Sequence, residues 1–217
     1  SGRPNFRAPE SLALALKEKG FDLVQTANTY SIQNGVSGLK STIKYLNTVG
    51  IDHVGTYVAQ DDKNTNEGVL LKNVNGIKIA FIGYTKGVNN EKLPEGSEFC
   101  VDLLYQDYWT EYKEINTDGI VKSVKAAKAL DPDVIVAMLH WGSESDSAVT
   151  DSQKKIKNLL FENGVDAALV TTILDHIVVK KGSTRDRVEL EIFLKFGDPQ
   201  RVIFSHRKTS DCFNPCS

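Results

Sequence analysis

The sequence DVIVAMLHW, at residues 133–141, contains an unbroken apolar run from Val134 to Leu139 and ends in His140 and Trp141. An apolar run of this length, without polar alternation, is typical of a strand that is buried on both faces. Such a strand belongs in the interior of a sheet. We therefore expect residues 133–141 to form a central strand.

The segments on either side of this strand alternate between helix and strand. Upstream, Ile120, Val124 and Ala127 are spaced for one face of a helix that ends near Pro132. Downstream, residues 150–164 predict a helix with Thr150 or Asp151 as its cap and Gly164 at its end, followed by a short buried strand at 166–170.

The rest of the chain extends this pattern. Residues 68–85 contain two strand-like runs around Asn75-Gly76, a pair that tolerates positive φ and so predicts an antiparallel hairpin. Together, the segments predict a layered α/β fold with a mixed sheet. Further predicted elements are helices at 9–20 and 36–50, strands at 21–27 and 53–58, and C-terminal strands at 176–181, 188–196 and 201–206.

The composition is that of an ordinary globular protein: 217 residues, 41% apolar, 25% charged, with a formal net charge of -2. At this length, a single domain covering residues 1–217 is expected. The near-neutral charge offers no basic surface for nucleic acid, so we expect no such partner. No run approaches the roughly 20 apolar residues of a spanning helix, and we expect no signal or anchor in this chain.

The cysteines leave two interpretations open. Cys212 and Cys216 are close enough in sequence to form a disulfide, which would leave Cys100 over. The alternative is that both are incidental thiols of the tail. A zinc site is disfavoured because no second Cys/His pair lies nearby.

In sheets of this kind, chemistry collects in the loops beyond the carboxyl ends of the strands. His140 leads directly into such a loop, where Glu144 and Asp146 bring carboxylates near an imidazole. This is the outline of a metal site or an acid–base pair, with His140 and Glu144 as candidate catalytic residues. The structural alternative is a partly buried histidine that is hydrogen-bonded to a neighbouring loop.

Other candidates are weaker. Asp175-His176 could place a carboxylate behind an imidazole ligand, although adjacent strand residues point to opposite faces. His53 and His206 are interpreted as structural, and the aromatic residues of segment 105–112 as either a ligand platform or a packed cluster. The sequence has neither a phosphate loop in a strand-to-helix context nor a Gly-x-Ser-x-Gly elbow, which disfavours phosphate-loop enzymes and α/β-hydrolases.

Five segments stand in an order and spacing shared with a known family. They are NFRAPESLALALKEKGFDLVQTAN (5–28), GVSGLKSTIKYLNTVGIDHVGTY (35–57), NGIKIAFIGYTKGVN (75–89), DPDVIVAMLHWGSE (131–144) and QKKIKNLLFENGVDAALV (153–170). They resemble the CapA family of bacterial capsule and poly-γ-glutamate synthesis proteins, also called PgsA. The resemblance covers residues 5–170, and residues 171–217 form a divergent, β-rich tail.

The resemblance implies an αββα-type layered fold related to calcineurin-like metallophosphoesterases, in which loops at strand ends hold two metals. The family's loop after the strand at 21–27 reads Ala-Asn-Asn-His, followed by an Asp and a Gly. Asn28 matches the first Asn, whereas Thr29, Tyr30 and Gln33 replace the second Asn, the His and the Asp. Tyrosine, with a pKa near 10, cannot replace imidazole.

The remaining ligands of the family are also incomplete in this sequence. His140 and Glu144 stand where the family would place polar residues, and His176 is at most a displaced remnant of a later Gly-x-His-Pro-His motif. The opening strand with the first metal-binding Asp is missing, so we expect a fold that is incomplete at its amino-terminal end. The candidate metal ligands are therefore Asn28, His140 and His176, in a site that we expect to be vestigial and without a cofactor.

The resemblance predicts an accessory protein of capsule or poly-γ-glutamate biosynthesis with a polymer-binding or assembly role, on the extracellular face of the cytoplasmic membrane. Its expected partners are an anionic capsule polymer or poly-γ-glutamate and other capsule-synthesis proteins, with a homo-oligomer left open.

Two other functions remain open. One is a metal-dependent phosphoesterase, using Mn, Zn or Fe, whose other ligands come from an absent amino-terminal segment. The other is an interaction domain with no link to capsule. Polymer binding would need a local basic patch such as Lys154, Lys155 and Lys157, which otherwise form an exposed helix face.

Overall fold

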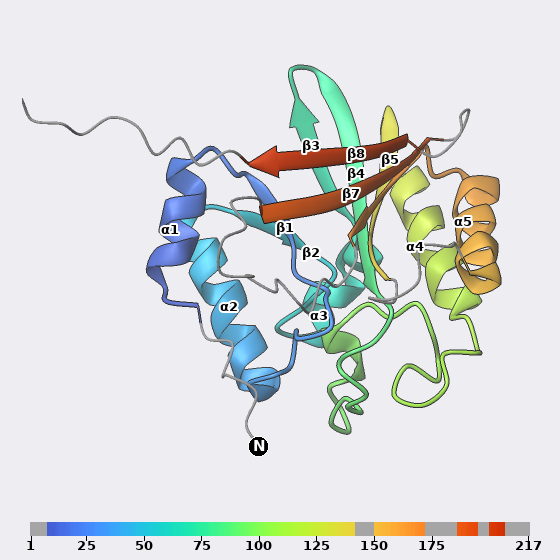
Figure 1. Ribbon diagram of the computed structural model, residues 1–217, viewed down its shortest axis with the longest axis horizontal. Coiled ribbons are helices and arrows are strands. Elements are labelled where there is room, and N and C mark those ends of the chain that lie inside the picture. The colour runs from blue at the N-terminus through green and yellow to red at the C-terminus, as the bar shows by residue number, and fades with distance from the viewer. Residues whose placement is uncertain (1–7, 142–149, 172–185, 195–199, 207–217) are drawn as a thin grey trace, which may run out of the picture.

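The computed structural model describes residues 8–141, 150–171, 186–194 and 200–206. It has a mixed α/β architecture with mixed strand directions, which confirms the fold class expected from the sequence (Figure 1). The elements, in chain order, are α1 (Ser11–Glu18), β1 (Leu23–Gln25), α2 (Gly35–Val49), β2 (Asp52–Val54), α3 (Gln60–Asn64), the 3-10 helix η1 (Thr65–Gly68), β3 (Leu70–Val74), β4 (Ile77–Thr85), the 3-10 helix η2 (Glu98–Cys100), α4 (Thr117–Ala129), β5 (Val134–His140), α5 (Asp151–Asn163), β6 (Ala167–Thr171), β7 (Asp186–Leu194) and β8 (Gln200–His206).

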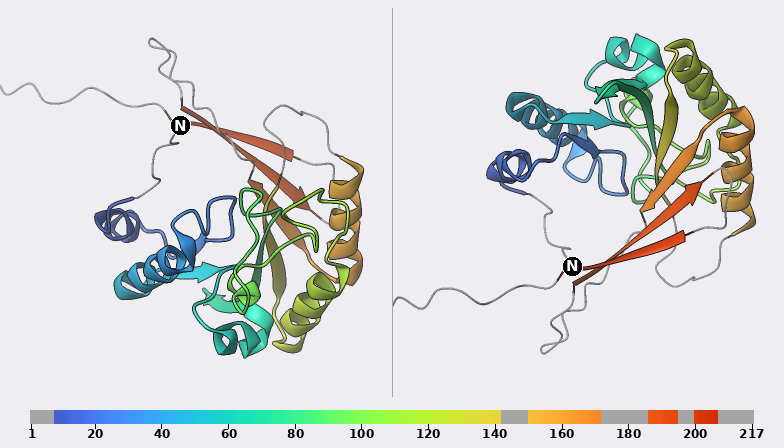
Figure 2. Two further views of the ribbon diagram at one scale, coloured as in Figure 1. Left: turned by 90° about the horizontal axis from the view of Figure 1, so that it is seen from below. Right: turned by 90° about the horizontal axis from the view of Figure 1, so that it is seen from above.

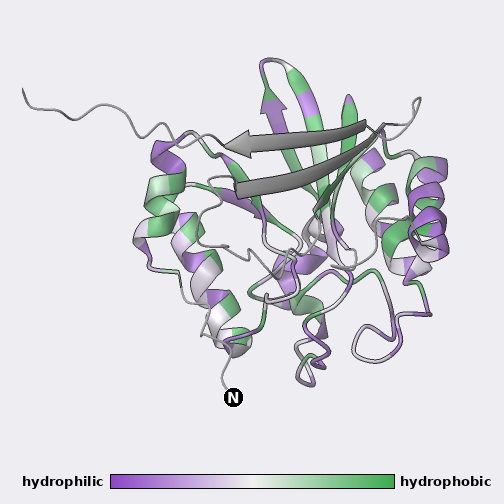
Figure 3. Ribbon diagram, in the orientation of Figure 1, coloured by the Kyte–Doolittle hydropathy of each residue, from purple (hydrophilic) through white to green (hydrophobic). Residues whose placement is uncertain are grey.

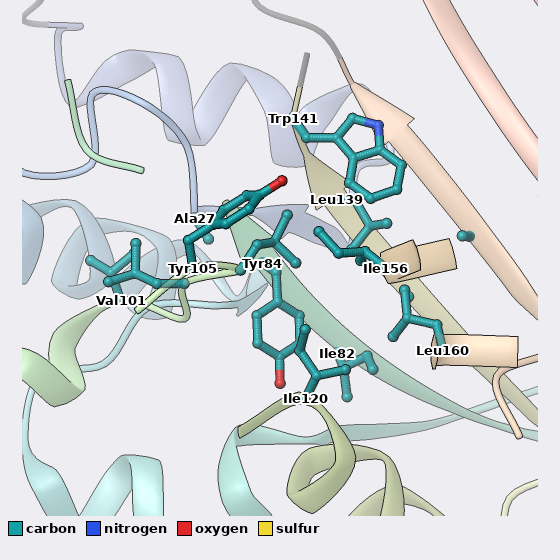
Figure 4. Close-up of a cluster of buried hydrophobic side chains, with 14 of the residues drawn as sticks. Ala27, Ile82, Tyr84, Val101, Tyr105, Ile120, Leu139, Trp141, Ile156 and Leu160 are labelled. Atoms are coloured by element: carbon teal, nitrogen blue, oxygen red, sulfur yellow. The ribbon is translucent and has the colours of Figure 1, made fainter. Parts of the chain in front are cut away.

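The main sheet has six strands in the order β3-β4-β5-β6-β7-β8. β4, β5 and β6 run parallel, and the outer pairings are antiparallel. β5 therefore lies in the sheet interior, as its apolar sequence predicted. Only one of its faces is fully buried, however: Ile135, Ala137 and Leu139 are buried, and the residues between them are half-buried. The buried face is the one that the helices cover, since Leu139 belongs to the same buried cluster as Ile156 and Leu160 of α5 (Figure 4).

The β3–β4 hairpin confirms the interpretation of Asn75-Gly76. Val74 pairs with Ile77, and the two residues between them have φ values of 54° and 90°. A two-residue turn with positive φ at both positions matches the right-handed twist of the strands. The hairpin projects from the body of the molecule (Figure 1).

β1 and β2 form a separate parallel pair, on the side of the molecule where α1 and α2 lie, away from α4 and α5 (Figures 1 and 2). The predicted strand at 53–58 was too long, because Gly55 adopts φ 92° and ends β2 at Val54. A Cβ at Gly55 would lie 2.6 Å from the Cβ of Ala27 and 2.9 Å from the carbonyl oxygen of Gly83. Glycine therefore lets the ends of β1, β2 and β4 approach closely.

α4 and α5 bury apolar stripes against the sheet and expose their polar sides. Ile156 and Leu160 of α5 are fully buried, whereas Lys154 and Lys155 are exposed. Figure 3 shows this division along α5, with hydrophilic residues on the outer side. Lys154 and Lys155 thus lie on a solvated face, whereas Lys157 is half-buried.

The long connection between β4 and α4 is packed rather than open. Cys100, Val101 and Leu104 are buried, and Cys100 is a free cysteine. The segment also makes isolated β-bridges, from Val101 to Thr56 and from Leu103 to Thr85. Residues 100–104 thereby join the carboxyl ends of β2 and β4.

Candidate functional site

The loop after β1 folds on itself through Asn28. Its side-chain Oδ1 accepts a hydrogen bond from the backbone N–H of Tyr30 (2.8 Å), and its Nδ2 donates to the carbonyl of Thr26 (3.1 Å). The backbone N–H of Asn28 donates to Ser31 Oγ at 2.8 Å. Asn28 therefore stabilises the turn, as Asn side chains commonly do, and both ends of its amide are used within the loop.

The structure brings this loop to the end of β5. Thr29 Oγ1 lies 3.3 Å from His140 Nε2, although the two residues are 111 positions apart. Both side chains are half-buried. The structure therefore brings the β1 loop and His140 to one edge of the fold, where Thr29, rather than Asn28, contacts the imidazole.

His140 is a neutral imidazole at physiological pH. Burial lowers its pKa from 6.5 to about 4, because a charged imidazolium loses its hydration inside the protein. A neutral imidazole can bind a metal or accept a proton. The chemistry of this edge thus depends on which other groups stand beside His140.

The described residues do not fit the dinuclear metal centre that the family resemblance implies. Among them, no three His, Cys, Asp or Glu side chains come together in a way that could hold a metal ion. Asn28 and Thr29 offer only neutral oxygens, and the Asn28 amide is engaged in the turn. Glu144 and His176, the other two candidate residues, lie outside the described residues, as does Asp175.

A buried ion pair near the same edge was not predicted from the sequence. Asp102, only 7% exposed, accepts hydrogen bonds from Lys63 Nζ and from the hydroxyl of Tyr57, the latter at 2.5 Å. Burial raises the pKa of Asp102, and Lys63 opposes this shift. The one available signal was an acidic residue in the apolar run FCVDLLY, because buried acids are nearly always paired.

The backbone of Asp102 links the two strand ends that border the candidate site. Its N–H donates to the carbonyl of Gly55 (2.9 Å), and its carbonyl accepts from the N–H of Thr85 (3.0 Å). Thr85 in turn pairs with His140 across β4 and β5. Asp102 therefore holds β2 and β4 together next to His140, which is a positioning role.

Two cavities adjoin these residues. One, of about 320 Å³, lies between α1, α2 and β1 and is bordered by Asn28 and Tyr30. The other, of about 270 Å³, is lined by Lys63, Asp102 and Tyr84, among others. Figure 4 shows the hydroxyls of Tyr84 and Tyr105 pointing in opposite directions, with the Tyr84 ring among Ile82 and Ile120.

The aromatic segment 105–112 is a packed cluster. The rings of Tyr105 and Tyr112 meet edge to face at 5.8 Å, and those of Tyr108 and Trp109 at 4.7 Å. His53, interpreted as structural, has a buried Nε2 that finds no hydrogen-bond partner among the described residues, and burial lowers its pKa. The side chain of His206 and the tail cysteines Cys212 and Cys216 lie outside the described residues.

Comparison with known proteins identifies relatives of this chain. A family model described as "Bacterial capsule synthesis protein PGA_cap" matches residues 1–171. The "Capsule biosynthesis protein CapA" of Bacillus anthracis is 27% identical over 167 residues, which cover 75% of this chain and 37% of that protein. The "PGA biosynthesis protein CapA" of Bacillus subtilis (strain 168) is 28% identical over 155 residues, covering 70% and 36%. This chain thus spans little more than a third of the length of these curated relatives.

Among solved structures, the chain is similar to a candidate 5'-nucleotidase from Staphylococcus aureus, crystallised in complex with α-ketoglutarate. The TM-score is 0.54 at 15% sequence identity, and the match covers 95% of this chain and 42% of that chain. At this level of identity the likeness concerns the fold, and it supports the metallophosphoesterase-like architecture expected from the sequence.

Proposed function

Because the chain belongs to the bacterial capsule synthesis protein family PGA_cap, we propose that it is a polymer-binding accessory component of capsule or poly-γ-glutamate biosynthesis. In this role it binds the acidic polymer and does not hydrolyse phosphoesters. The metallophosphoesterase-like site is then degenerate, with its turn retained and its ligands replaced.

The contact between Thr29 and His140 carries this proposal. A two-metal phosphoesterase needs several charged or imidazole ligands around a pair of ions roughly 3.5–4 Å apart. In the described part of the chain, one group that contacts His140 across this edge is a neutral hydroxyl, 3.3 Å away, and no three His, Cys, Asp or Glu side chains come together to hold a metal ion. Tyr30 and Gln33, where the family has His and Asp, cannot restore the charge.

The names of the relatives support the polymer and the location. Both CapA proteins are named for capsule or PGA biosynthesis, and capsule is made at the cell surface. In the described residues, no helix is long and apolar enough to cross a bilayer. We infer a place at the outer face of the cytoplasmic membrane, with other capsule-synthesis proteins as partners.

A binding and turnover experiment tests the proposal. The purified chain is mixed with poly-γ-glutamate, with the uncharged polymer dextran as a control, and binding is followed by light scattering. In parallel, hydrolysis of bis-p-nitrophenyl phosphate is measured with added Mn²⁺, Zn²⁺ or Fe²⁺. We expect the chain to bind poly-γ-glutamate but not dextran, and to hydrolyse no bis-p-nitrophenyl phosphate.

The opposite result would favour the metal-dependent phosphoesterase. Turnover that requires a metal and disappears in the His140→Ala variant would overturn the proposal. Absence of poly-γ-glutamate binding would overturn the polymer role.

A further inference from the structure

Two lysines of the loop after β4 lie on aromatic rings of segment 105–112. Lys86 Nζ is 4.5 Å from the centroid of the Tyr112 ring, and Lys92 Nζ is 4.9 Å from that of Trp109. Cation–π contacts of this kind hold an ammonium group while leaving its other side open. We define Lys86, Lys92, Trp109 and Tyr112 as the lysine–aromatic face.

Neither lysine of this face is neutralised by a carboxylate in the part of the chain that the structure describes. The ion pairs found there use other lysines, including Lys113, which pairs with Glu111 at 2.6 Å, and Lys122, which pairs with Glu67 at 2.9 Å. Lys86 is half-buried and Lys92 is exposed. The face thus presents two positive charges that form no ion pair with a carboxylate among the described residues.

The face is held in a strained and well-defined conformation. Tyr112 has φ 56°, which is a true outlier for a bulky residue, and Asn90 has φ 57°. The Tyr112 hydroxyl donates to Asn90 Oδ1 at 2.5 Å. The ring also lies close to Gly87, where an added Cβ would be 2.8 Å from Tyr112 Cε1. Backbone strain of this sort gathers at binding sites, where a fixed shape is needed.

The position of the face connects it with the candidate site. The backbone N–H of Lys86 donates to the carbonyl of His140 at 2.8 Å. The face therefore borders the same edge of the sheet as the Thr29–His140 contact. A polymer bound there would pass along the edge where the family resemblance places its chemistry.

We propose that the lysine–aromatic face is the site at which this chain binds a polymer that carries regularly repeated carboxylates. The inference rests on the proposed function, since it assumes the polymer and assigns its site. The ammonium groups of Lys86 and Lys92 pair with carboxylates, and the rings of Trp109 and Tyr112 contact the polymer's methylene groups. Each exposed charge pair is weak by itself, so binding depends on several contacts made at once.

The lysines of α5 offer a matched comparison. Lys154 is paired with Asp151 at 3.0 Å, and Lys155 lies beside it on the exposed side of the helix. Replacing Lys154 and Lys155 by glutamine changes the net charge by the same two units as replacing Lys86 and Lys92. Non-specific attraction between a polyanion and the whole chain would respond equally to both changes.

The test compares poly-γ-glutamate binding by the wild type, Lys86→Gln/Lys92→Gln and Lys154→Gln/Lys155→Gln. Glutamine keeps part of the aliphatic stem, and circular dichroism checks that each variant folds. We expect about tenfold weaker binding for the first pair, as expected for the loss of two charge contacts, and less than a twofold change for the second.

The outcomes separate the site from the function. Equal loss in both variants, or a larger loss on α5, would overturn the lysine–aromatic face while the polymer role stands. A wild type that binds no poly-γ-glutamate would overturn both. Wild-type binding of poly-γ-glutamate by Lys86→Arg/Lys92→Arg, in contrast to the glutamine variant, would support the site, because arginine keeps the charge and the ring contact.

Discussion

Replacing Lys63 by methionine should destabilise this protein strongly, because it leaves a buried carboxylate without its cation. The Lys63 side chain is 18% exposed and that of Asp102 is 10% exposed. Removing one partner of a buried ion pair costs about 3–5 kcal/mol. Lys63 keeps some access to water, so we expect about 3 kcal/mol at pH 7.5, the lower end of that range. For a domain of this size, the melting temperature should fall by about 6–12 °C.

The loss should depend on pH with a definite sign. Burial raises the pKa of Asp102, and Lys63 opposes this shift, so the variant's carboxyl should have a higher pKa still. A group whose pKa is raised by folding stabilises the protein at low pH, and this contribution is lost as the pH rises through the folded pKa. The difference in free energy of unfolding between the wild type and Lys63→Met should therefore shrink as the pH is lowered from 8 to 5.

Urea unfolding at several pH values measures this effect, and two variants serve as controls. Lys63→Met/Asp102→Asn should recover most of the lost stability, because it removes the buried charge as well. Lys122→Met should cost no more than about 1 kcal/mol, because Lys122 is 68% exposed in its pair with Glu67. The role of the buried pair would be contradicted if the free energies of unfolding of Lys63→Met and the wild type differed by less than about 0.5 kcal/mol. It would also be contradicted if adding Asp102→Asn did not restore stability.

Three further predictions follow from particular residues. Burial lowers the pKa of His140 to about 4, so its imidazole resonances should not titrate between pH 5.5 and 8 in NMR spectra. The unfolded chain takes up this proton near pH 6.5, so the free energy of unfolding should fall as the pH drops from 6.5 to 4. This fall should be smaller in His140→Gln. Gly55→Ala should lower the free energy of unfolding in urea by several kcal/mol, because the new Cβ meets Ala27 and the Gly83 carbonyl. Gly76 has a similar φ of 90° and nothing within 4 Å, so Gly76→Ala should cost only about 1 kcal/mol. Equal costs would contradict the close packing of β2 on β4. A triple variant, Thr29→Asn/Tyr30→His/Gln33→Asp, should bind Zn²⁺ measurably in isothermal titration calorimetry, and adding His140→Ala should remove this binding. A triple variant that binds Zn²⁺ no better than the wild type would contradict the view that these three positions lost the ligands.

The features that local sequence rules govern were predicted well. Asn75-Gly76 fixed the hairpin because two residues with positive φ are needed there. The apolar run ending at His140 placed β5 in the sheet interior, where β4 and β6 flank it and the side chains on its two faces are buried or half-buried. The strand expected at 53–58 was shortened by Gly55, whose role depends on the approach of Ala27 and Gly83. That approach is a tertiary contact, which no local pattern reports.

The contacts within the candidate site were not predicted. The sequence placed the β1 loop and His140 at one edge, because loops at the carboxyl ends of parallel strands gather there. It did not show that Asn28 turns into its own loop while Thr29 meets the imidazole. Asp102 pairs with a lysine 39 residues away, and Lys86 with a ring 26 residues away. Such pairs arise from the packing of long loops, which has no periodic signature in the sequence.

The proposed function requires that the loop after β1 has kept its turn and lost its metal ligands. Elemental analysis of the purified chain, after incubation with Mn²⁺, Zn²⁺ and Fe²⁺ and removal of the unbound ions, tests it most directly. We expect far less than one metal ion per chain, with no difference between the wild type and His140→Ala. A stoichiometric metal that is lost in His140→Ala would contradict it.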